Sequence, residues 1–229
     1  MAGLVRYLSQ TNYRMKKVTL ALLLMIVCLS MKAQEVKKSP EVSLVFGLNQ
    51  PLVLNGFNFE VNYWTKKIVI DYSHGFGLEL QDDLVSEDAR DQKLAFNITH
   101  SLGFGLGYRF TKNFNVRLEP KWHFWEVYYD DAFKTPEGKI TDYTTFTLGL
   151  GAYYRWTPFE KKENILKGLT IVPSFRWWPT VATSLENDEY KYYNTRTEQN
   201  EIHKANNIGI SNTPFFVNVS IGYTINIKK

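Results

Sequence analysis

The feature that most restricts the fold is a strict two-residue alternation over Leu94–Phe110. Even positions there carry mostly large apolar side chains, and odd positions carry polar residues or glycine. Side chains of a β-strand alternate between two faces, so this period predicts a long strand with one apolar face. The pattern recurs after Pro40, where helical spacing is nearly absent. The predicted strands are 42–48, 57–64, 68–78, 94–110, 114–128, 144–156, 169–181 and 215–227.

The polar face of these strands is rich in glycine, which indicates the face that points inward. In a soluble sandwich the polar face meets water, where Lys, Glu and Thr are favoured over glycine. A narrow lumen needs small side chains where they converge, and the apolar face then meets lipid. We therefore predict an all-β fold, an eight-stranded antiparallel up-and-down transmembrane β-barrel. The glycines are Gly47, Gly75, Gly77, Gly103, Gly105, Gly107, Gly149, Gly151 and Gly222.

The connections between the predicted strands are short on one side and long on the other. Residues 65–67 and 111–113 are tight turns, and 157–168 joins two strands on the same side through a capping-box sequence that predicts a helical turn. This asymmetry is typical of outer-membrane barrels, so we expect the long connections to face the outside of the cell. They are 49–56, 79–93, 130–142 and 184–213.

Four tyrosines on the apolar face predict a belt at one membrane interface. Tyr63, Tyr108, Tyr154 and Tyr223 each lie near the short-turn end of a predicted strand. Tyrosine is enriched where acyl chains meet water, because its ring is apolar and its hydroxyl is polar. High strand propensity explains the abundance of tyrosine but not the shared height of these four.

Residues 1–33 predict an export signal, and 34–229 the barrel. Translation is expected to start at Met15, followed by a basic pair, an apolar run over 18–29 and a cleavage site near Ala33. The only cysteine, Cys28, lies in this leader, so the mature chain offers neither a disulfide nor a thiol nucleophile. Five of the 27 basic residues also lie there, which leaves 22 basic against 23 acidic side chains and argues against a nucleic-acid partner.

Two segments resemble a known family. They are LGFGLGYRFTKNFNVRLEP (Leu102–Pro120) and FFVNVSIGYTINI (Phe215–Ile227). Both are similar to small eight-stranded outer-membrane proteins of the OmpA-like and OmpX-like kind, within the broad outer membrane protein β-barrel group. The resemblance implies a Gram-negative outer-membrane location, contact with outer-membrane lipid and assembly by the barrel-assembly machinery. Family members usually end on an aromatic residue that the assembly machinery reads, whereas this chain ends Ile227-Lys228-Lys229. Either Tyr223 serves as the assembly signal or the signal differs in this chain.

Charged residues on the inward face predict an ion-paired lumen. Pairing two neighbouring strands about the turn at 111–113 sets Gly107 opposite Arg117 and Gly103 opposite Lys121. Eight strands leave room for side chains but not for an open channel, so these charges are expected to pair and plug the interior. A gated ion path is the functional alternative. The predicted cluster contains Glu60, Asp71, Arg109, Arg117, Glu119, Lys121, Arg155 and Arg176.

Three polar residues fall on the predicted lipid face: His74, His100 and Glu126. Some eight-stranded enzymes carry a Ser-His-acid set on the outer wall to modify lipids. Here Ser101 follows His100 but points into the lumen, and no metal, phosphate-loop or hydrolase motif is present. We therefore predict a barrel that is not an enzyme and holds no cofactor.

The sequence leaves the role of the barrel open between several alternatives. We expect a structural or surface-interaction role through the long loops, with the last loop as the candidate contact to an extracellular or envelope protein. A PorT-like component of a secretion or envelope-assembly machine, a lipid-modifying enzyme, a small pore and a soluble lipocalin-like carrier are the other interpretations.

Three prolines are expected to disturb the pairing of the predicted strands. Pro120 falls within 114–128, and Pro173 and Pro179 fall within 169–181. Proline lacks the backbone N–H that a strand ladder needs, and a closed barrel has no edge at which to place it. Irregularity is expected most in the seventh strand.

Overall fold

The computed structural model describes residues 40–227. The signal peptide predicted for 1–33 lies outside these residues. The strands of the described part are β1 Glu41–Gly47, β2 Phe57–Trp64, β3 Ile68–Leu80, β4 Leu94–Arg109, β5 Phe114–Tyr129, β6 Lys139–Tyr154, β7 Leu169–Trp177, β8 Thr180–Thr183, β9 Glu189–Asn194, β10 Gln199–Lys204 and β11 Phe215–Asn226.

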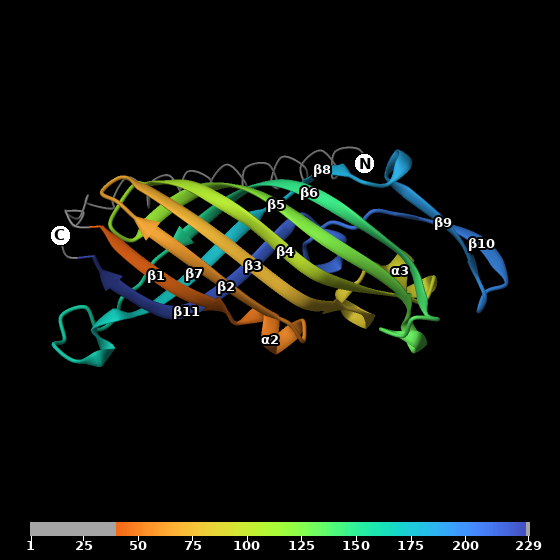
Figure 1. Ribbon diagram of the computed structural model, residues 1–229, viewed down its shortest axis with the longest axis horizontal. Helices are drawn as coiled ribbons and strands as arrows, with labels where there is room; N and C mark the ends of the chain where they lie inside the picture. The colour runs from red at the N-terminus through yellow and green to blue at the C-terminus, as the bar shows by residue number, and fades with distance from the viewer. Residues whose placement is uncertain (1–39, 228–229) are drawn as a thin grey trace, which may run out of the picture. The chain divides into compact units, whose positions relative to one another are not determined.

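The strands form a closed antiparallel barrel, which confirms the predicted fold class. The sheet runs in the order β5-β4-β3-β2-β1-β11-β7-β6-β8, and a further pairing of β5 with β6 closes it. β7 and β8 pair with successive stretches of β6, so together they count as one strand of the wall. The barrel therefore has eight strand positions around its circumference. The tight turns lie at one end, and α3 and the β9–β10 hairpin lie at the other (Figure 1).

Short helical segments interrupt the connections. They are α2 Asn49–Val53, α3 Glu87–Asp91, η1 Asp82–Leu84, η2 Asp130–Ala132, η3 Ile165–Gly168, η4 Glu186–Asp188 and η5 Ile210–Asn212. A helical turn does lie in 157–168, but it is η3, whose N-cap is Asn164: the backbone N–H of Leu166 donates to Oδ1 of Asn164. The capping-box sequence that begins at Thr157 starts no helix, and residues 158–161 form a turn. In the described part of the chain, no helix is both long enough and apolar enough to cross a membrane.

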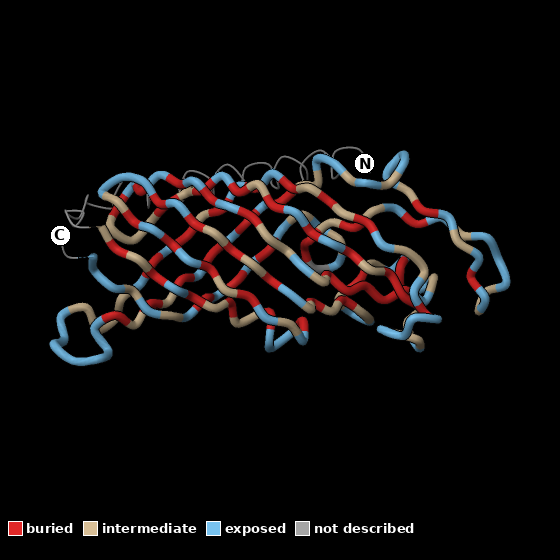
Figure 2. Tube along the Cα trace, in the orientation of Figure 1, coloured by how far each residue is buried: buried red, intermediate tan, exposed pale blue. Residues whose placement is uncertain are grey.

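Burial alternates along the strands, as the two-residue period predicts (Figure 2). The alternation changes phase at two residues, Gly77 on β3 and Thr99 on β4. Gly77 has a φ of 64°, and the pairing of β4 with β5 shifts between Ile98 and His100. An extra residue in a strand moves every later side chain to the opposite face. The prediction that Leu78, Leu94, Phe96 and Ile98 face lipid is therefore wrong, because all four are buried.

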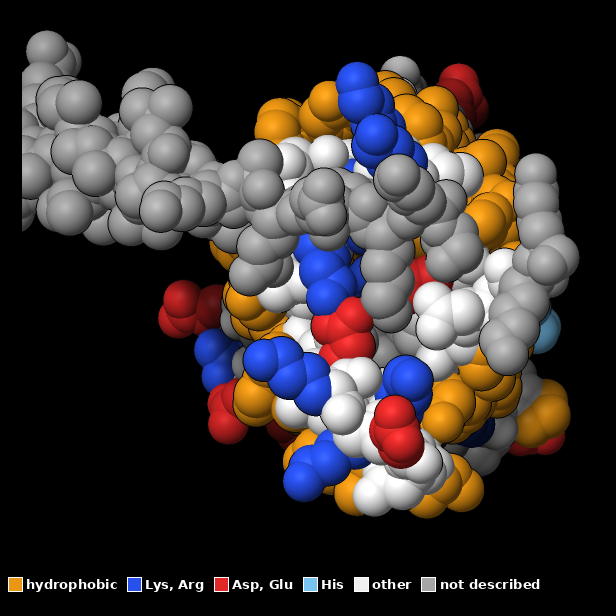
Figure 3. Space-filling model, turned by 90° about the vertical axis from the view of Figure 1, so that its left-hand side faces the viewer, with side chains coloured by type: hydrophobic (Ala, Val, Ile, Leu, Met, Phe, Trp, Pro, Cys, Tyr) orange, Lys and Arg blue, Asp and Glu red, His pale blue; other side chains and the backbone are white. Residues whose placement is uncertain are grey.

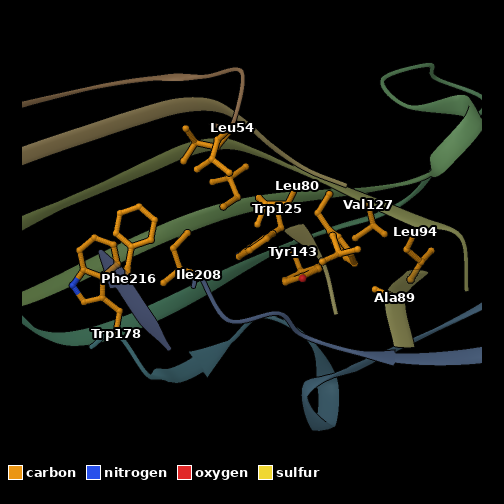
Figure 4. Packing of buried hydrophobic residues seen from close by; sticks show 14 of the residues in the cluster. Leu54, Leu80, Ala89, Leu94, Trp125, Val127, Tyr143, Trp178, Ile208 and Phe216 are labelled. Atoms are coloured by element: carbon orange, nitrogen blue, oxygen red, sulfur yellow. The ribbon is translucent and has the colours of Figure 1, made fainter. Parts of the chain in front are cut away.

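These inward residues form an apolar core toward the long-loop end of the barrel (Figure 4). Strands β3 to β6 supply Leu80, Phe96 and Trp125 among others, and the long connections supply Leu54 and Ile208. The loops thus pack against the extended wall of β3 to β6. This apolar packing fixes the position of the loops at this end.

Of the three prolines, only Pro179 interrupts a predicted strand, the seventh. The expectation is wrong for Pro120 and Pro173, which pair with Leu148 and Val219 within continuous ladders. β7 ends at Trp177, β8 resumes at Thr180, and the N–H of Trp178 donates 2.7 Å to the carbonyl oxygen of Pro214 instead of to β6. The β6–β7 seam consequently has four residue pairs and the β6–β8 seam three, whereas β5 and β6 share fifteen.

Candidate functional site: the charged lumen and the loop platform

Four strands place a buried ion-pair network in the middle of the barrel. Nη1 of Arg117 on β5 lies 2.8 Å from Oε1 of Glu60 on β2 and 3.0 Å from Oδ2 of Asp71 on β3. Nη2 of Arg176 on β7 lies 3.3 Å from the other oxygen of Glu60. All four side chains are buried. The carboxylate of Glu60 therefore links two guanidinium groups that come from different sides of the lumen.

A second group of partners surrounds Glu119 on β5. Oε1 of Glu119 accepts a 2.6 Å hydrogen bond from the Tyr153 hydroxyl, and Oε2 accepts one of 3.2 Å from the Trp178 indole. Nζ of Lys121 lies 3.5 Å from Glu119 and donates 2.6 Å to Oγ of Ser73. Together with the Glu60 group, the central network holds three carboxylates and three cations, so its formal charges balance.

Two aromatic rings lie over the cations of this network. The Tyr153 ring centroid is 3.8 Å from the guanidinium carbon of Arg117 and 4.9 Å from that of Arg176. Trp178 covers Arg176 at 5.0 Å and Nζ of Lys121 at 4.5 Å. Such cation–π contacts gain strength when water is removed. Sequence reasoning missed both rings, although the odd-numbered parity of the 144–156 strand marks Tyr153 as inward.

Arg109 and Arg155, the other two predicted lumen residues, lie outside this network at the short-turn end. Nη2 of Arg155 is 2.8 Å from Glu41, a partner that sequence reasoning also missed. Arg109 donates to the backbone carbonyl oxygens of Thr65 and Lys112 and so joins the two tight turns. The eight predicted residues therefore fall into a central group of six and a terminal group of two.

Glycines leave the space that the large charged side chains occupy. Gly107 pairs with Arg117 and Gly103 with Lys121, as the turn geometry predicts. A Cβ atom at Gly105 would lie 1.9 Å from Oδ2 of Asp71. Any larger residue at Gly105 would therefore displace a carboxylate that Arg117 holds.

The last long connection forms a structured platform, which we define as the β9–β10 hairpin, residues 189–204. Nδ2 of Asn194 donates 3.0 Å to the carbonyl oxygen of Gln92, and Nδ1 of His203 lies 2.8 Å from the Gln92 side-chain oxygen. Burial lowers the pKa of His203, so its ring is uncharged at neutral pH. The sequence predicted a loop here, and the hairpin adds two strands that are held against the 79–93 connection. Two large apolar side chains, Tyr193 and Ile202, remain exposed on it.

The outer wall of the barrel is apolar. The four tyrosines of the predicted belt, Tyr63, Tyr108, Tyr154 and Tyr223, all point outward and are exposed. From the short-turn end, hydrophobic side chains surround the periphery, and charged and polar atoms occupy the middle (Figure 3). A closed barrel with an apolar exterior and a polar interior satisfies its backbone internally and presents hydrocarbon to lipid. This is the fold of a small transmembrane β-barrel.

The polar residues predicted on the outer wall lie in two places. Glu126 is near the long-loop end, where Nδ2 of Asn97 and the Tyr128 hydroxyl donate to it and Lys139 pairs with it at 3.3 Å. His74 and His100 contact each other, and His100 lies three residues along β4 from Asn97, toward the short-turn end.

Two solved structures are similar to this barrel. One is Ail, the attachment invasion locus protein of Yersinia pestis, at 9% identity, with 82% of this chain and 97% of that chain covered and a TM-score of 0.38. The other is Ail in complex with the heparin analogue sucrose octasulfate, at 10% identity with the same coverage and a TM-score of 0.35. No family model and no curated protein matches the chain.

Proposed function

We propose that the protein is a non-enzymatic outer-membrane barrel with a plugged lumen, which meets an extracellular or envelope partner through its loop platform. The observation that carries the plug is the balanced ion-pair network of Glu60, Asp71, Arg117, Glu119, Lys121 and Arg176. Its side chains come from β2, β3, β5 and β7, so they cross the lumen instead of lining one wall. The apolar core at the long-loop end supports the same conclusion.

The loop platform supports the interaction role. Its hairpin is tied to the barrel through Gln92, and it presents Tyr193 and Ile202 to solvent. A rigid surface with exposed aromatic and aliphatic side chains loses little conformational entropy when a partner binds. The barrel-assembly machinery is the other protein partner that we propose, because the barrel forms only when the first strand of the chain, β1, pairs with the last, β11.

A non-enzymatic role is supported by the partners of the histidines on the outer wall. The hydroxyl group that His74 contacts is that of Tyr72, at 3.1 Å. Ser101 instead contacts His123 inside the lumen, 2.8 Å from Nδ1, where the other ring nitrogen of His123 faces Thr147. A serine nucleophile with a histidine base and an orienting carboxylate is thus not assembled by these residues.

Planar-bilayer recordings test the plug. Wild-type protein is expected to insert without steady conductance, because the paired side chains fill the lumen. Glu119→Ala removes the acceptor of Tyr153, Trp178 and Lys121, so it should lower thermal stability and open no path. Stable conductance by the wild type, with an ion selectivity that Glu119→Ala changes at unaltered stability, would contradict the proposal and favour a small pore.

Cysteine labelling tests the orientation of the loop platform. Cys28 is the only cysteine and lies in the predicted leader, so an introduced cysteine should be the only thiol of the mature chain. Asn200→Cys, on the exposed hairpin, should react with a membrane-impermeant maleimide in intact cells. Lys66→Cys, on an exposed tight turn, is the matched control and should react only after the outer membrane is permeabilised. The reverse pattern would place the platform in the periplasm.

A further inference from the structure

The outer wall carries a histidine pair that neither the plug nor the platform uses. Nε2 of His74 on β3 lies 3.2 Å from Nδ1 of His100 on β4, and both rings are outside the lumen. His100 is exposed and His74 is half-buried. The two rings project from neighbouring strands, where His74 pairs with Leu102 and His100 pairs with Phe76. The two histidines are therefore diagonal neighbours on the outer face. Their separation is thus fixed by the barrel wall.

We propose that His74 and His100 form a two-imidazole site for a divalent transition-metal ion such as Zn²⁺. Neutral imidazole is a preferred ligand of these ions, with metal–nitrogen bonds of about 2.0 to 2.1 Å. Two nitrogens on one tetrahedral ion therefore lie about 3.3 to 3.4 Å apart. The observed 3.2 Å is close to this value. Without metal this spacing is a hydrogen bond between the two rings, so a bound ion takes the place of the shared proton, which moves from Nδ1 to Nε2 of His100.

The partner of the other His74 nitrogen fits this assignment. Nδ1 of His74 lies 3.1 Å from the Tyr72 hydroxyl, which shares the outer face of β3. Metal-bound histidines usually donate their second ring N–H to an oxygen acceptor, which fixes the tautomer and the ring orientation. Tyr72 is therefore a positioning residue, and it leaves Nε2 of His74 free to bind metal.

The depth of the histidine pair in the membrane determines which other ligands a bound metal ion can reach. His100 lies eight residues from Tyr108, a belt tyrosine on the same strand, β4. For a strand tilted by about 40°, this separation corresponds to about 20 Å along the membrane normal. The apolar band of such barrels is about 25 Å tall. Just beyond the pair, Asn97 and Glu126 form a polar contact. With the long loops outside the cell, as proposed above, His74 and His100 lie near the outer-leaflet interface, where water or headgroup oxygens can complete the coordination.

The pair supplies only part of a coordination shell. Among residues 40–227, no group of three or more His, Cys, Asp and Glu side chains is placed to hold a metal ion. The site therefore differs from a structural zinc centre, in which four protein ligands close the coordination. It is an open site whose other ligands come from the surroundings.

Zn²⁺ titration of the full-length mature protein, purified in detergent micelles without a polyhistidine tag, tests the proposal. Isothermal titration calorimetry with ZnCl₂ at pH 7.5 should show one ion per chain. His74→Gln and His100→Gln should each weaken binding by at least about 10-fold, because each removes one of two nitrogen ligands. Tyr72→Phe should weaken it about 10-fold through loss of the oriented ring. His203→Gln, in the loop platform, is the matched control and should leave binding unchanged.

A spectroscopic measurement separates ligand loss from general damage. The Cu²⁺ EPR spectrum should show two coordinated imidazole nitrogens in the wild type and one in His100→Gln. Heat-modifiable gel mobility identifies variants that still form the barrel. Absence of Zn²⁺ binding to wild-type protein, or unchanged binding in a folded His74→Gln/His100→Gln double variant, would overturn the proposal. Neither result depends on whether the lumen is plugged.

Discussion

Replacing Glu60 with alanine is expected to lower the free energy of unfolding by about 3 to 5 kcal/mol. The carboxylate of Glu60 contacts Arg117 at 2.8 Å and Arg176 at 3.3 Å, and all three side chains are buried. Alanine at this position would leave a net positive charge in the lumen, with Arg176 deprived of its ion-pair partner. Removing one member of a buried pair costs more than the pair contributes, because the remaining charge stays without water. Urea unfolding in lipid vesicles measures the difference.

Two variants serve as controls for Glu60→Ala. Glu60→Gln keeps the shape and one acceptor oxygen, so its cost should be smaller. Asp83→Ala removes the exposed ion pair between Asp83 and Arg90 in the 79–93 connection and should change stability little, because surface pairs contribute little. Equal stability of wild type and Glu60→Ala would show that the network does not hold the barrel together.

Phe104→Arg is expected to cost about 2 to 4 kcal/mol of stability in a bilayer. Phe104 lies at mid-strand on the outer face of β4, 54% exposed, with its ring 5.4 Å from that of Tyr72. An arginine there must either enter hydrocarbon or reach toward an interface, and both cost free energy. Unfolding in vesicles, compared with Phe104→Leu, gives the cost of the charge alone.

Phe104→Leu should be nearly neutral in the same measurement, because leucine meets lipid as well as phenylalanine does. A tolerated Phe104→Arg would contradict the assignment of the apolar face to lipid. It would then favour the soluble carrier, in which exposed positions accept charge.

The strand alternation sufficed to predict the barrel and the inward charges, because both follow from a period of two. It did not predict the apolar core at the long-loop end. Gly77 and Thr99 each shift the alternation, and a bulge leaves no periodic signature of its own. Leu78 and Phe96 therefore seemed to belong to the lipid face, although both are buried.

Some contacts of the lumen also lie beyond the reach of a strand pattern. Trp178 enters the network because the break at Pro179 frees it from the β6–β7 ladder, so its direction follows from tertiary structure. Glu41 begins β1 one residue before the predicted strand and pairs with Arg155 across the barrel. The β9–β10 hairpin is held by contacts to the 79–93 connection, which no local pattern encodes.

The barrel wall is most weakly paired between β6 and its neighbours β7 and β8, so we expect it to open there first. Local opening requires less free energy where fewer backbone hydrogen bonds must break. The β6–β7 and β6–β8 seams have four and three residue pairs on either side of Pro179, and one further bridge joins Trp156 to Ile171 beyond β6, whereas β5 and β6 share fifteen pairs. Thermal fluctuations should therefore part the wall sideways between Tyr143 and Tyr153, toward the bilayer.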